Sequence, residues 1–418
     1  MKFSSKFFAI ILAVILQNGC ALHPTKSEFK SCHFDGQVLK PSDSKNNIYS
    51  AIKNLTQDLD GRQQDICLSG EYTNFRNFDA LVLSGGGPGG AFGSGFISQL
   101  IEKNKLSVVG KDDIPHPCLI TGVSTGAVMA PFVYLATSLN PKFRDEYTDK
   151  LYNLYSEFDD ESLLKKRNLI GVLLNNSFYD VSGIKETINK LLTPQLIQDI
   201  NQEYESTHRL LLIGATEYYS GEFEVFNLTN LISAAAKSQT NKDRLCAGES
   251  IRASSSIPVA FEPVPILDNG KYKLYEDGGV RHMVFLNLKV FDEIGSNRTK
   301  RLFGVINSTG EYTHYDDQKA RKGVSILNVA LRSAALGENQ LYLDSAYLTD
   351  QAAASFGTIT KWVNAKSNVN DKNKCELPNG KMFDPQYQRC LMKRGVDKAN
   401  SDKPWDLDIT LTPTDITK

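Results

Sequence analysis

Two glycine-rich turns, each set between a predicted strand and a predicted helix, constrain the fold of this chain most strongly. The turns are the GGGPGG run at 85–90 and the GVSTG run at 122–126. Apolar stretches at 80–83 and 118–121 precede them, and helix-like patterns at 91–106 and 127–139 follow. Two such units predict an α/β fold in which both turns lie at the carboxyl edge of neighbouring strands, where open sheets carry their sites.

The second turn is typical of a strand-to-helix elbow that exposes a serine. Gly122 and Gly126 flank Ser124, and glycine lets neighbouring backbone pass closely without a Cβ clash. Ser124 would begin the following helix, whose N-terminus carries partial positive charge that favours an alkoxide or an oxyanion. We therefore predict Ser124 as a nucleophile. The alternative is a serine that caps an ordinary helix start.

The first turn offers several backbone N–H groups to an anion. Consecutive glycines at Gly85, Gly86 and Gly87 allow these groups to converge on one point, as in an oxyanion hole. The alternative is a phosphate-binding turn, because G-x-G-x-x-G also fits residues 85–90. That alternative lacks the acidic ribose partner expected roughly 20 residues further on.

The YEDGG run at 275–279 supplies a base for the serine. It follows a strand-like stretch at 271–274, so Asp277 would lie at the same edge of the sheet as the two turns. A carboxylate there is able to accept the proton of a serine hydroxyl. The alternative is a simple tight turn, for which Asp-Gly is a common solution.

Together these motifs resemble the patatin-like phospholipases, which use a Ser-Asp dyad without a histidine. The glycine-rich turn, G-x-S-x-G and the later D-G-G at 277–279 occur here in the family's order, and the ASSSIPVAFEPV stretch at 253–264 is similar to the segment ahead of its aspartate. The resemblance covers residues 78–287 and, more loosely, the pattern to about residue 365. It implies an α/β fold, a three-layer α/β/α sandwich around a central, mostly parallel sheet.

The resemblance also implies a serine acyl hydrolase without a cofactor. Asp277 would take the proton from Ser124, the serine would attack an ester carbonyl, and water would release the acyl group. Phospholipase A, lysophospholipase and simple esterase activities all fit this chemistry. The chain departs from the family at Gly89, where an arginine or lysine is common in the oxyanion turn.

Two other functions remain open from the residues alone. A Ser-His-Asp α/β-hydrolase would use Ser124, Asp277 and His314 in that chain order, whereas His282 is too close in sequence to Asp277 for that role. A catalytically silent descendant that binds lipid or a protein would keep the fold without the reaction. Loss of all acyl-ester hydrolysis would favour this last reading.

The N-terminus predicts export. Lys2 and Lys6 precede a short apolar core at 7–16, and Gly19-Cys20 suggests a lipoprotein cleavage site with Cys20 as the lipidated residue. This would anchor the protein to a bacterial membrane facing the periplasm, with the outer membrane favoured. The alternative, an uncleaved membrane anchor, has a short apolar stretch compared with the roughly 20 residues of a bilayer span.

Cysteine content supports an oxidising compartment. Cys375 and Cys390 bracket a polar loop and form one predicted disulfide, while Cys32 and Cys67 form a second candidate pair. Cys118, within a predicted strand, is expected to be a buried thiol. The sequence contains no Cys/His spacing typical of zinc and no calcium-loop pattern, so we predict no metal.

The remaining sequence sets the domain organisation. We predict a signal peptide at 1–20, an N-terminal extension at 21–77, a catalytic domain at 78–365 with a helical insertion around 147–204 that covers the site, and a polar C-terminal excursion and tail at 366–418. The net charge of −1 excludes a general electrostatic attraction to nucleic acid. The expected partners are an acyl-ester substrate and a membrane surface; no pattern indicates a protein partner.

Overall fold

The computed structural model describes most of the region between residues 76 and 409, together with three short N-terminal pieces. The described residues are 30–32, 38–39, 67, 76–156, 158–166, 179–180, 182–238, 241–258, 260–268, 270–286, 298–309, 326–366, 375–377, 381–407 and 409. The predicted signal peptide, Cys20 and His314 lie outside these residues.

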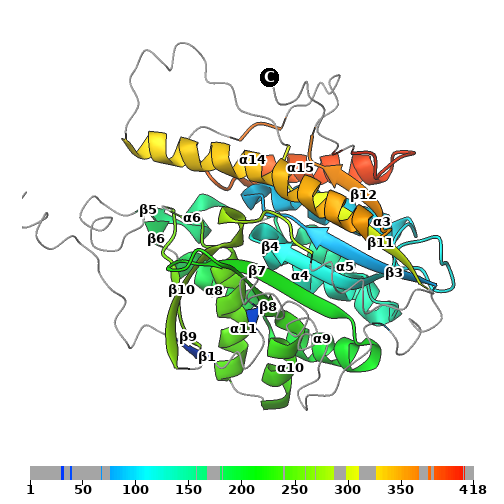
Figure 1. The fold of residues 1–418 in the computed structure, drawn as a ribbon, viewed down its shortest axis with the longest axis horizontal. Coiled ribbons are helices and arrows are strands. Elements are labelled where there is room, and N and C mark those ends of the chain that lie inside the picture. Colours follow the sequence, from blue (N-terminus) through cyan, green and yellow to red (C-terminus); the bar gives the residue numbers. More distant parts are fainter. Residues whose placement is uncertain are drawn as a thin grey trace, which may run out of the picture.

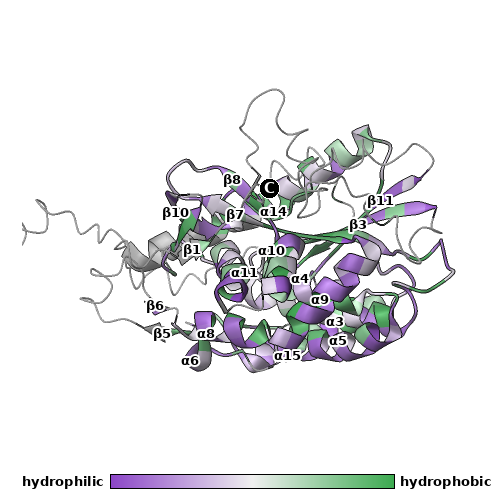
Figure 2. Cartoon of the chain, turned by 90° about the horizontal axis from the view of Figure 1, so that it is seen from below, coloured by the Kyte–Doolittle hydropathy of each residue, from purple (hydrophilic) through white to green (hydrophobic). Residues whose placement is uncertain are grey.

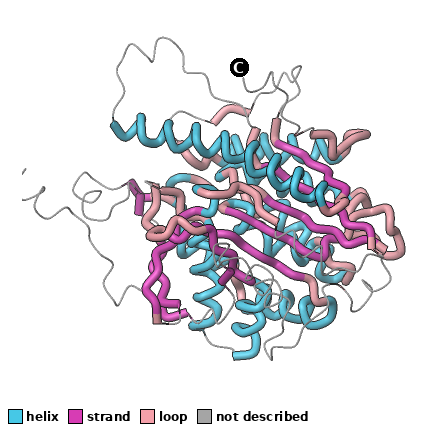
Figure 3. The backbone as a smooth tube through the Cα atoms, in the orientation of Figure 1, coloured by secondary structure: helices cyan, strands magenta, loops and turns pink. Residues whose placement is uncertain are grey.

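A single twisted sheet runs through the middle of the described structure (Figure 3). Its strands follow the order β1-β9-β10-β7-β4-β3-β11-β12, with β8 paired to β7 and β2 to β8. The bounds are β1 Lys30–Cys32, β2 Val38–Leu39, β3 Asn77–Leu83, β4 Pro117–Val123, β7 Leu210–Glu217, β8 Phe223–Asn227, β9 Val264–Asp268, β10 Lys271–Asp277, β11 Thr299–Ile306 and β12 Ile359–Asn364. The five strands from β12 to β7 are parallel to one another, whereas β8 and β10 are antiparallel to β7. A small separate sheet pairs β5 Lys165–Lys166 with β6 Tyr179–Asp180.

Helices cover both faces of the large sheet, as Figures 1 and 2 show. The bounds are α3 Gly90–Glu102, α4 Thr125–Ala136, α5 Pro141–Asn153, α6 Asp160–Leu163, α8 Ser182–Leu191, α9 Pro194–Thr207, α10 Leu228–Ser238, α11 Asn241–Ser254, α14 Ile326–Ser355 and α15 Pro385–Ala399. The long helix α14 lies on one face, and α3, α4, α5 and α15 lie on the other (Figure 2). The expected three-layer α/β/α architecture with a mostly parallel centre is therefore confirmed.

The alternation of side chains along β3 explains the two layers of core. Leu81 and Leu83 join the cluster that contains α3 and α4, whereas Ala80 and Val82 join the cluster that contains Tyr342 of α14. Successive side chains of a strand point to opposite faces, so an apolar run such as this one requires cover on both sides.

Both predicted strand–turn–helix units are confirmed. β3 and α3 flank the first glycine-rich turn, and β4 and α4 flank the second. β3 and β4 are adjacent and parallel, with Leu83 beside Gly122 in the register. The two turns therefore emerge side by side at the carboxyl edge of the sheet.

The prediction of a polar surface excursion for the C-terminal region is wrong for α15. Its Leu391 and Met392 are buried against α3, and Gly395 packs so closely that an added Cβ would lie 2.2 Å from the Phe92 carbonyl oxygen. Trp405 follows and packs edge-on against Phe96. The contact depends on small residues, which a search for apolar periodicity does not detect.

The described residues contain three disulfides, and two of them connect segments far apart along the chain. Cys375 and Cys390 form the pair that the sequence predicted. The second expected pair is wrong, because Cys32 bonds to Cys246 of α11 and Cys67 bonds to Cys118 of β4. Cys118 is buried as expected, but as a disulfide rather than a thiol.

The corrected pairing follows from the sheet. β1 runs parallel to β9, which brings Cys32 to α11, and the Cys67 N–H donates to the His208 carbonyl beside the start of β7. These neighbours are brought together by tertiary structure, so spacing along the chain does not reveal them.

Among the helices that the structure describes, none has the length and apolarity needed to cross a bilayer.

Candidate active site

Ser124 occupies a strained backbone position between β4 and α4. Its φ is 53° and its ψ is −123°, a left-handed φ that is uncommon for a residue with a side chain. The side chain is buried, with 3% of the residue exposed, and it borders an apolar pocket. A strained serine at a strand-to-helix turn is the geometry of a nucleophile elbow.

The two flanking glycines allow the elbow to close. A Cβ on Gly126 would lie 2.3 Å from the Leu83 carbonyl oxygen, and a Cβ on Gly122 would lie 2.5 Å from the Gly126 carbonyl oxygen. The first turn of α4 therefore packs directly on the end of β3. Neither position has room for a Cβ, so both must be glycine. This gives a physical reason for the G-x-S-x-G spacing.

Two serines at the end of α11 fix the backbone of the elbow on both sides. The Ser124 N–H donates to Ser254 Oγ at 3.0 Å, and Ser254 in turn donates to the Gly214 carbonyl at 2.6 Å. The Ser255 hydroxyl lies 3.1 Å from the Ser124 carbonyl oxygen, to which it is able to donate. The ASSS stretch seen in the sequence thus holds the strained residue in place.

The glycine-rich turn lies beside Ser124. A Cβ on Gly85 would be 3.2 Å from the Ser124 Cβ, and Gly87 borders the same pocket as the serine. The Gly85 N–H donates to the Met283 carbonyl at 3.1 Å, so it is already occupied. Gly86 and Gly87, with φ of 145° and 50°, are the remaining candidates for an oxyanion hole.

Asn307, which directly follows β11, holds this turn through hydrogen bonds to Ser84. Its Nδ2 donates to the Ser84 carbonyl at 2.8 Å, and its backbone N–H donates to Ser84 Oγ at 2.8 Å. The Asn307 carbonyl oxygen occupies the space that a Cβ would need on Gly86 and on Gly89, at 2.2 and 1.9 Å. Gly89, the departure from the family pattern, is therefore required by close packing.

Asp277 ends β10 at the same edge of the sheet and is 4% exposed. β10 pairs with β7, placing Asp277 beside Ala215, and β7 pairs with β4, placing Gly214 beside Val123. Gly278, the residue after Asp277, lies close to β4, since an added Cβ would be 3.0 Å from Val123 Cγ1. One strand, β7, therefore separates Asp277 from β4, the strand that ends in the elbow.

The carboxylate of Asp277 is held by its own turn. Its Oδ1 accepts from the Gly279 N–H at 2.7 Å, and its backbone N–H donates to the Ser256 carbonyl at 2.8 Å. Ser256 follows the two serines that hold the elbow, so one short segment contacts both Asp277 and Ser124. The sequence stretch ahead of the aspartate links the two predicted catalytic residues.

His282 lies close after Asp277 in the chain. Its ring packs edge-on against the Phe223 ring, with 5.0 Å between the ring centroids, and burial, with a contribution from Arg281, lowers its pKa. The histidine of the alternative triad, His314, lies outside the described residues.

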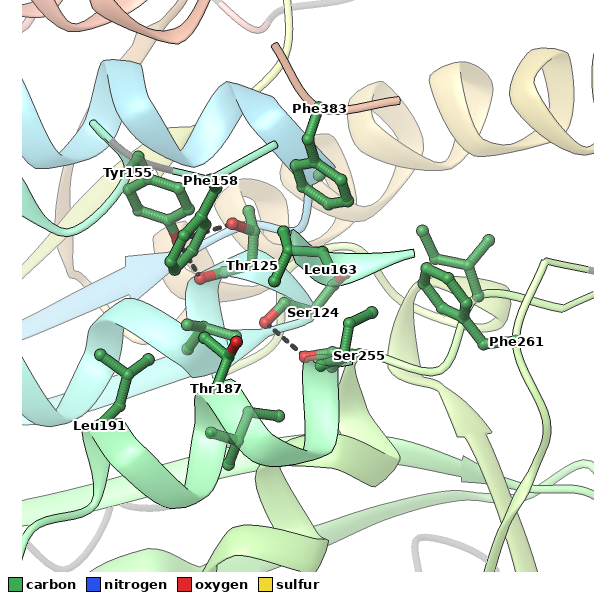
Figure 4. A pocket seen from close by; sticks show the side chains of 15 residues that line it. Ser124, Thr125, Tyr155, Phe158, Leu163, Thr187, Leu191, Ser255, Phe261 and Phe383 are labelled. Atoms are coloured by element: carbon green, nitrogen blue, oxygen red, sulfur yellow. Dashed lines mark hydrogen bonds between the residues drawn. The ribbon is translucent and has the colours of Figure 1, made fainter. Parts of the chain in front are cut away.

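The pocket beside Ser124 is apolar, as Figure 4 shows. Its volume, with open solvent included, is about 540 Å³. Its apolar walls come from α4, the α5–α8 region, the segment after α11 and the segment before α15: Val128, Tyr155, Phe158, Leu163, Ile184, Ile188, Leu191, Ile257, Phe261 and Phe383. No lysine, arginine, aspartate or glutamate is among the described residues that line it.

One tyrosine links the elbow to the glycine-rich turn. The Tyr155 hydroxyl lies 2.6 Å from Thr125 Oγ1 and donates to the Thr125 carbonyl at 2.9 Å (Figure 4). A Cβ on Gly90 would be 2.4 Å from Thr125 Oγ1 and 2.5 Å from Tyr155 Cζ. Burial raises the pKa of this tyrosine, so it remains a neutral donor.

Sequence reasoning missed several residues that build the site. Asn307, Tyr155 and Phe383 lie far from the glycine motifs in sequence and carry no local signature. The ASSS stretch is apparent in the sequence, but its role depends on where α11 ends. Asn307 directly follows β11, and only the order of the strands places it next to β3 and the glycine turn.

Comparison with known proteins agrees with this geometry. Residues 81–288 match the family model described as patatin-like phospholipase. No curated protein matches the sequence.

Two solved structures show weak similarity. VipD from Legionella pneumophila is 14% identical, with 78% of this chain and 66% of that chain covered and a TM-score of 0.32. A chain in the complex of full-length SpcU with full-length ExoU, from the type III secretion system of Pseudomonas aeruginosa, is 14% identical, with 66% and 53% covered and a TM-score of 0.24. This chain therefore spans only part of the length of either one.

Proposed function

Because residues 81–288 form a patatin-like phospholipase domain, we propose that this chain is a serine acyl hydrolase that cleaves lipid carboxylic esters. The observation that carries the proposal is the strained, buried Ser124, which lies beside the glycine-rich turn and opens on an apolar pocket. An apolar pocket at a nucleophile favours a substrate whose acyl part is a hydrocarbon chain.

In the proposed reaction Asp277 accepts the proton of the Ser124 hydroxyl while Oγ attacks the ester carbonyl. The backbone N–H groups of Gly86 and Gly87 and the N-terminus of α4 stabilise the oxyanion. Collapse of this intermediate expels the alcohol, which takes the proton from Asp277. Water, deprotonated by Asp277, then attacks the acyl-enzyme. The fatty acid is released as Ser124 Oγ leaves and takes the proton back from Asp277.

The pocket supports recognition of the acyl chain rather than of a charged head group. No charged side chain is found among the described lining residues, and the close approach of Asn307 excludes a side chain at Gly89. We therefore propose that the enzyme distinguishes phospholipid, lysophospholipid and neutral esters mainly by their acyl chains.

We also propose that the protein is exported and attached to a bacterial membrane through lipid on Cys20, facing the periplasm. The three disulfides support an oxidising compartment. Incorporation of labelled palmitate into the wild type but not into Cys20→Ala would test the attachment. Equal labelling of both proteins would contradict it.

Hydrolysis of p-nitrophenyl butyrate by the wild type, Ser124→Ala, Asp277→Asn and His314→Ala tests the proposed function. We expect kcat to fall by at least about 10³-fold in the first two variants, because each removes a group that acts in both chemical steps. His314→Ala is the control and should keep wild-type activity. An equally inactive His314→Ala would favour the Ser-His-Asp alternative, and wild-type inactivity on this ester and on phospholipid vesicles would refute the proposal.

A further inference from the structure

A small cluster of apolar side chains, separate from the two main cores, forms one wall of the pocket. It is built around Leu163, Leu164, Ala260 and Phe261, and Met382 and Phe383 pack against it. Leu163, Phe261 and Phe383 all line the pocket that contains Ser124. We call this group the roof cluster. It combines α6, the segment after α11 and the C-terminal region.

The C-terminal part of the roof cluster is held by specific backbone contacts. Asp160, in the first turn of α6, accepts from the Phe383 N–H at 2.6 Å through Oδ1 and from the Met382 N–H at 3.1 Å through Oδ2. The next residue, Asp384, caps α15 by accepting from the Tyr387 N–H at 2.9 Å. Phe383 is therefore fixed between a carboxylate on one side and a capped helix on the other.

Covalent and packing constraints extend this support. The Cys375–Cys390 disulfide joins the segment before Phe383 to the middle of α15. α15 is in turn packed against α3, where Gly95 and Gly395 bring the two helices into close contact. The ring of Phe383 thus projects into the pocket from a rigid support (Figure 4).

We infer that Phe383 is a specificity-determining residue: it contacts the hydrocarbon chain of the substrate and gives the enzyme its preference for long acyl chains. This inference rests on the proposed function and names the part of the substrate that the site selects. Phe383 lies outside the 81–288 match, so chain selection comes from an appendage of this chain. A short acyl group covers little of the apolar wall of the pocket. Each further methylene that a longer chain buries there adds favourable binding free energy.

The test compares kcat/KM for p-nitrophenyl laurate and p-nitrophenyl butyrate in the wild type, Phe383→Ala and Phe383→Leu. Leu377→Ala is the matched control, since Leu377 lies in the same disulfide-closed loop, is 37% exposed and does not line the pocket. We expect the laurate-to-butyrate ratio to fall about tenfold in Phe383→Ala, less in Phe383→Leu and not at all in Leu377→Ala. Asp160→Ala should lower the ratio as well, because it releases the backbone of Phe383.

Binding of laurate to Ser124→Ala, measured by calorimetry with and without Phe383→Ala, separates the two proposals. Weaker laurate binding in the double variant supports the inference even if no ester is hydrolysed, in which case the proposed function alone fails. A laurate-to-butyrate ratio in Phe383→Ala that equals or exceeds that of Leu377→Ala would overturn the inference while leaving Ser124-dependent hydrolysis intact. Failure of the Ser124→Ala protein to bind laurate would overturn it too.

Discussion

At the scale of single residues, Gly89 shows how packing replaces a side chain that the family pattern would place there. Its backbone has an ordinary φ of −63°, so conformation does not require glycine. The requirement comes from the Asn307 carbonyl oxygen, 1.9 Å from the position of a Cβ. A basic residue in this turn would need β11 to end differently.

Gly89→Lys is therefore expected to damage the glycine turn rather than strengthen an anion site. The side chain forces the turn away from Asn307, so kcat on a short ester should fall by about tenfold or more, and the thermal midpoint should fall with it. Gly221→Lys is a suitable control, because Gly221 has no atom within 4 Å of an added Cβ, although its φ of 66° adds some strain. Increased activity in Gly89→Lys would contradict this account of the turn.

Tyr155→Phe tests whether the tyrosine positions the elbow. The substitution keeps the ring but removes the hydroxyl that contacts Thr125 Oγ1 and the Thr125 carbonyl. We expect kcat to fall about tenfold with KM almost unchanged, because the oxyanion turn and Ser124 lose their fixed relation. A change in KM alone would assign Tyr155 to the pocket wall instead.

At the scale of elements, the crossing of α3 and α15 depends on glycine. An added Cβ on Gly395 would lie 2.2 Å from the Phe92 carbonyl oxygen, and one on Gly95 would lie 2.2 Å from the Met392 carbonyl oxygen. Helices that approach this closely need a missing side chain on each partner. Phe383 lies just before α15, so the position of α15 against α3 helps to place Phe383 at the pocket. The geometry of the crossing therefore affects the proposed substrate selection.

Two glycine-to-alanine substitutions in helices should have opposite effects on stability. Gly395→Ala is expected to lower the free energy of unfolding by about 1–3 kcal/mol through overpacking. Gly337→Ala, on α14 with no atom within 4 Å of an added Cβ, should raise it by about 0.5–1 kcal/mol through helix propensity. Urea denaturation of the two variants beside the wild type measures both, and a stabilising Gly395→Ala would refute the close crossing.

At the scale of the whole molecule, a buried histidine makes stability depend on pH. His116 donates its backbone N–H to Asp79 Oδ2 at 2.6 Å, and its Nε2 lies 3.0 Å from the Lys111 carbonyl oxygen. Burial lowers the pKa of His116 from 6.5 to about 4. As the pH falls below 6.5, the unfolded chain therefore takes up a proton that the folded protein excludes.

The free energy of unfolding should accordingly fall by up to about 3 kcal/mol between pH 6.5 and pH 4 through this one group. His116→Gln keeps a donor for the Lys111 carbonyl without a titrating ring, so its stability should fall less over the same range. Chemical denaturation at pH 7, 5.5 and 4.5 compares the two proteins. If the free energy of unfolding fell equally with pH in both proteins, folding would not lower the pKa of His116, and this account would be wrong.

The sequence by itself determined the local units of this protein. The glycine spacing around Ser124 and the run at 85–90 are requirements of backbone conformation, and backbone conformation is a local property. Apolar runs and their length fixed the central strands and the α/β class for the same reason. The order of the motifs was enough to indicate a patatin-like fold.

Only the tertiary structure decided which distant residues share a neighbourhood. The partners of Cys32 and Cys67, the support that Asn307 gives the glycine turn, and the arrival of Phe383 at the pocket all depend on sheet order and helix crossing. α15 escaped sequence reasoning because Leu391, Met392 and Gly395, which pack against α3, form only a narrow stripe on a largely polar helix. Such contacts join segments far apart along the chain, and the pattern within one segment does not identify its partner.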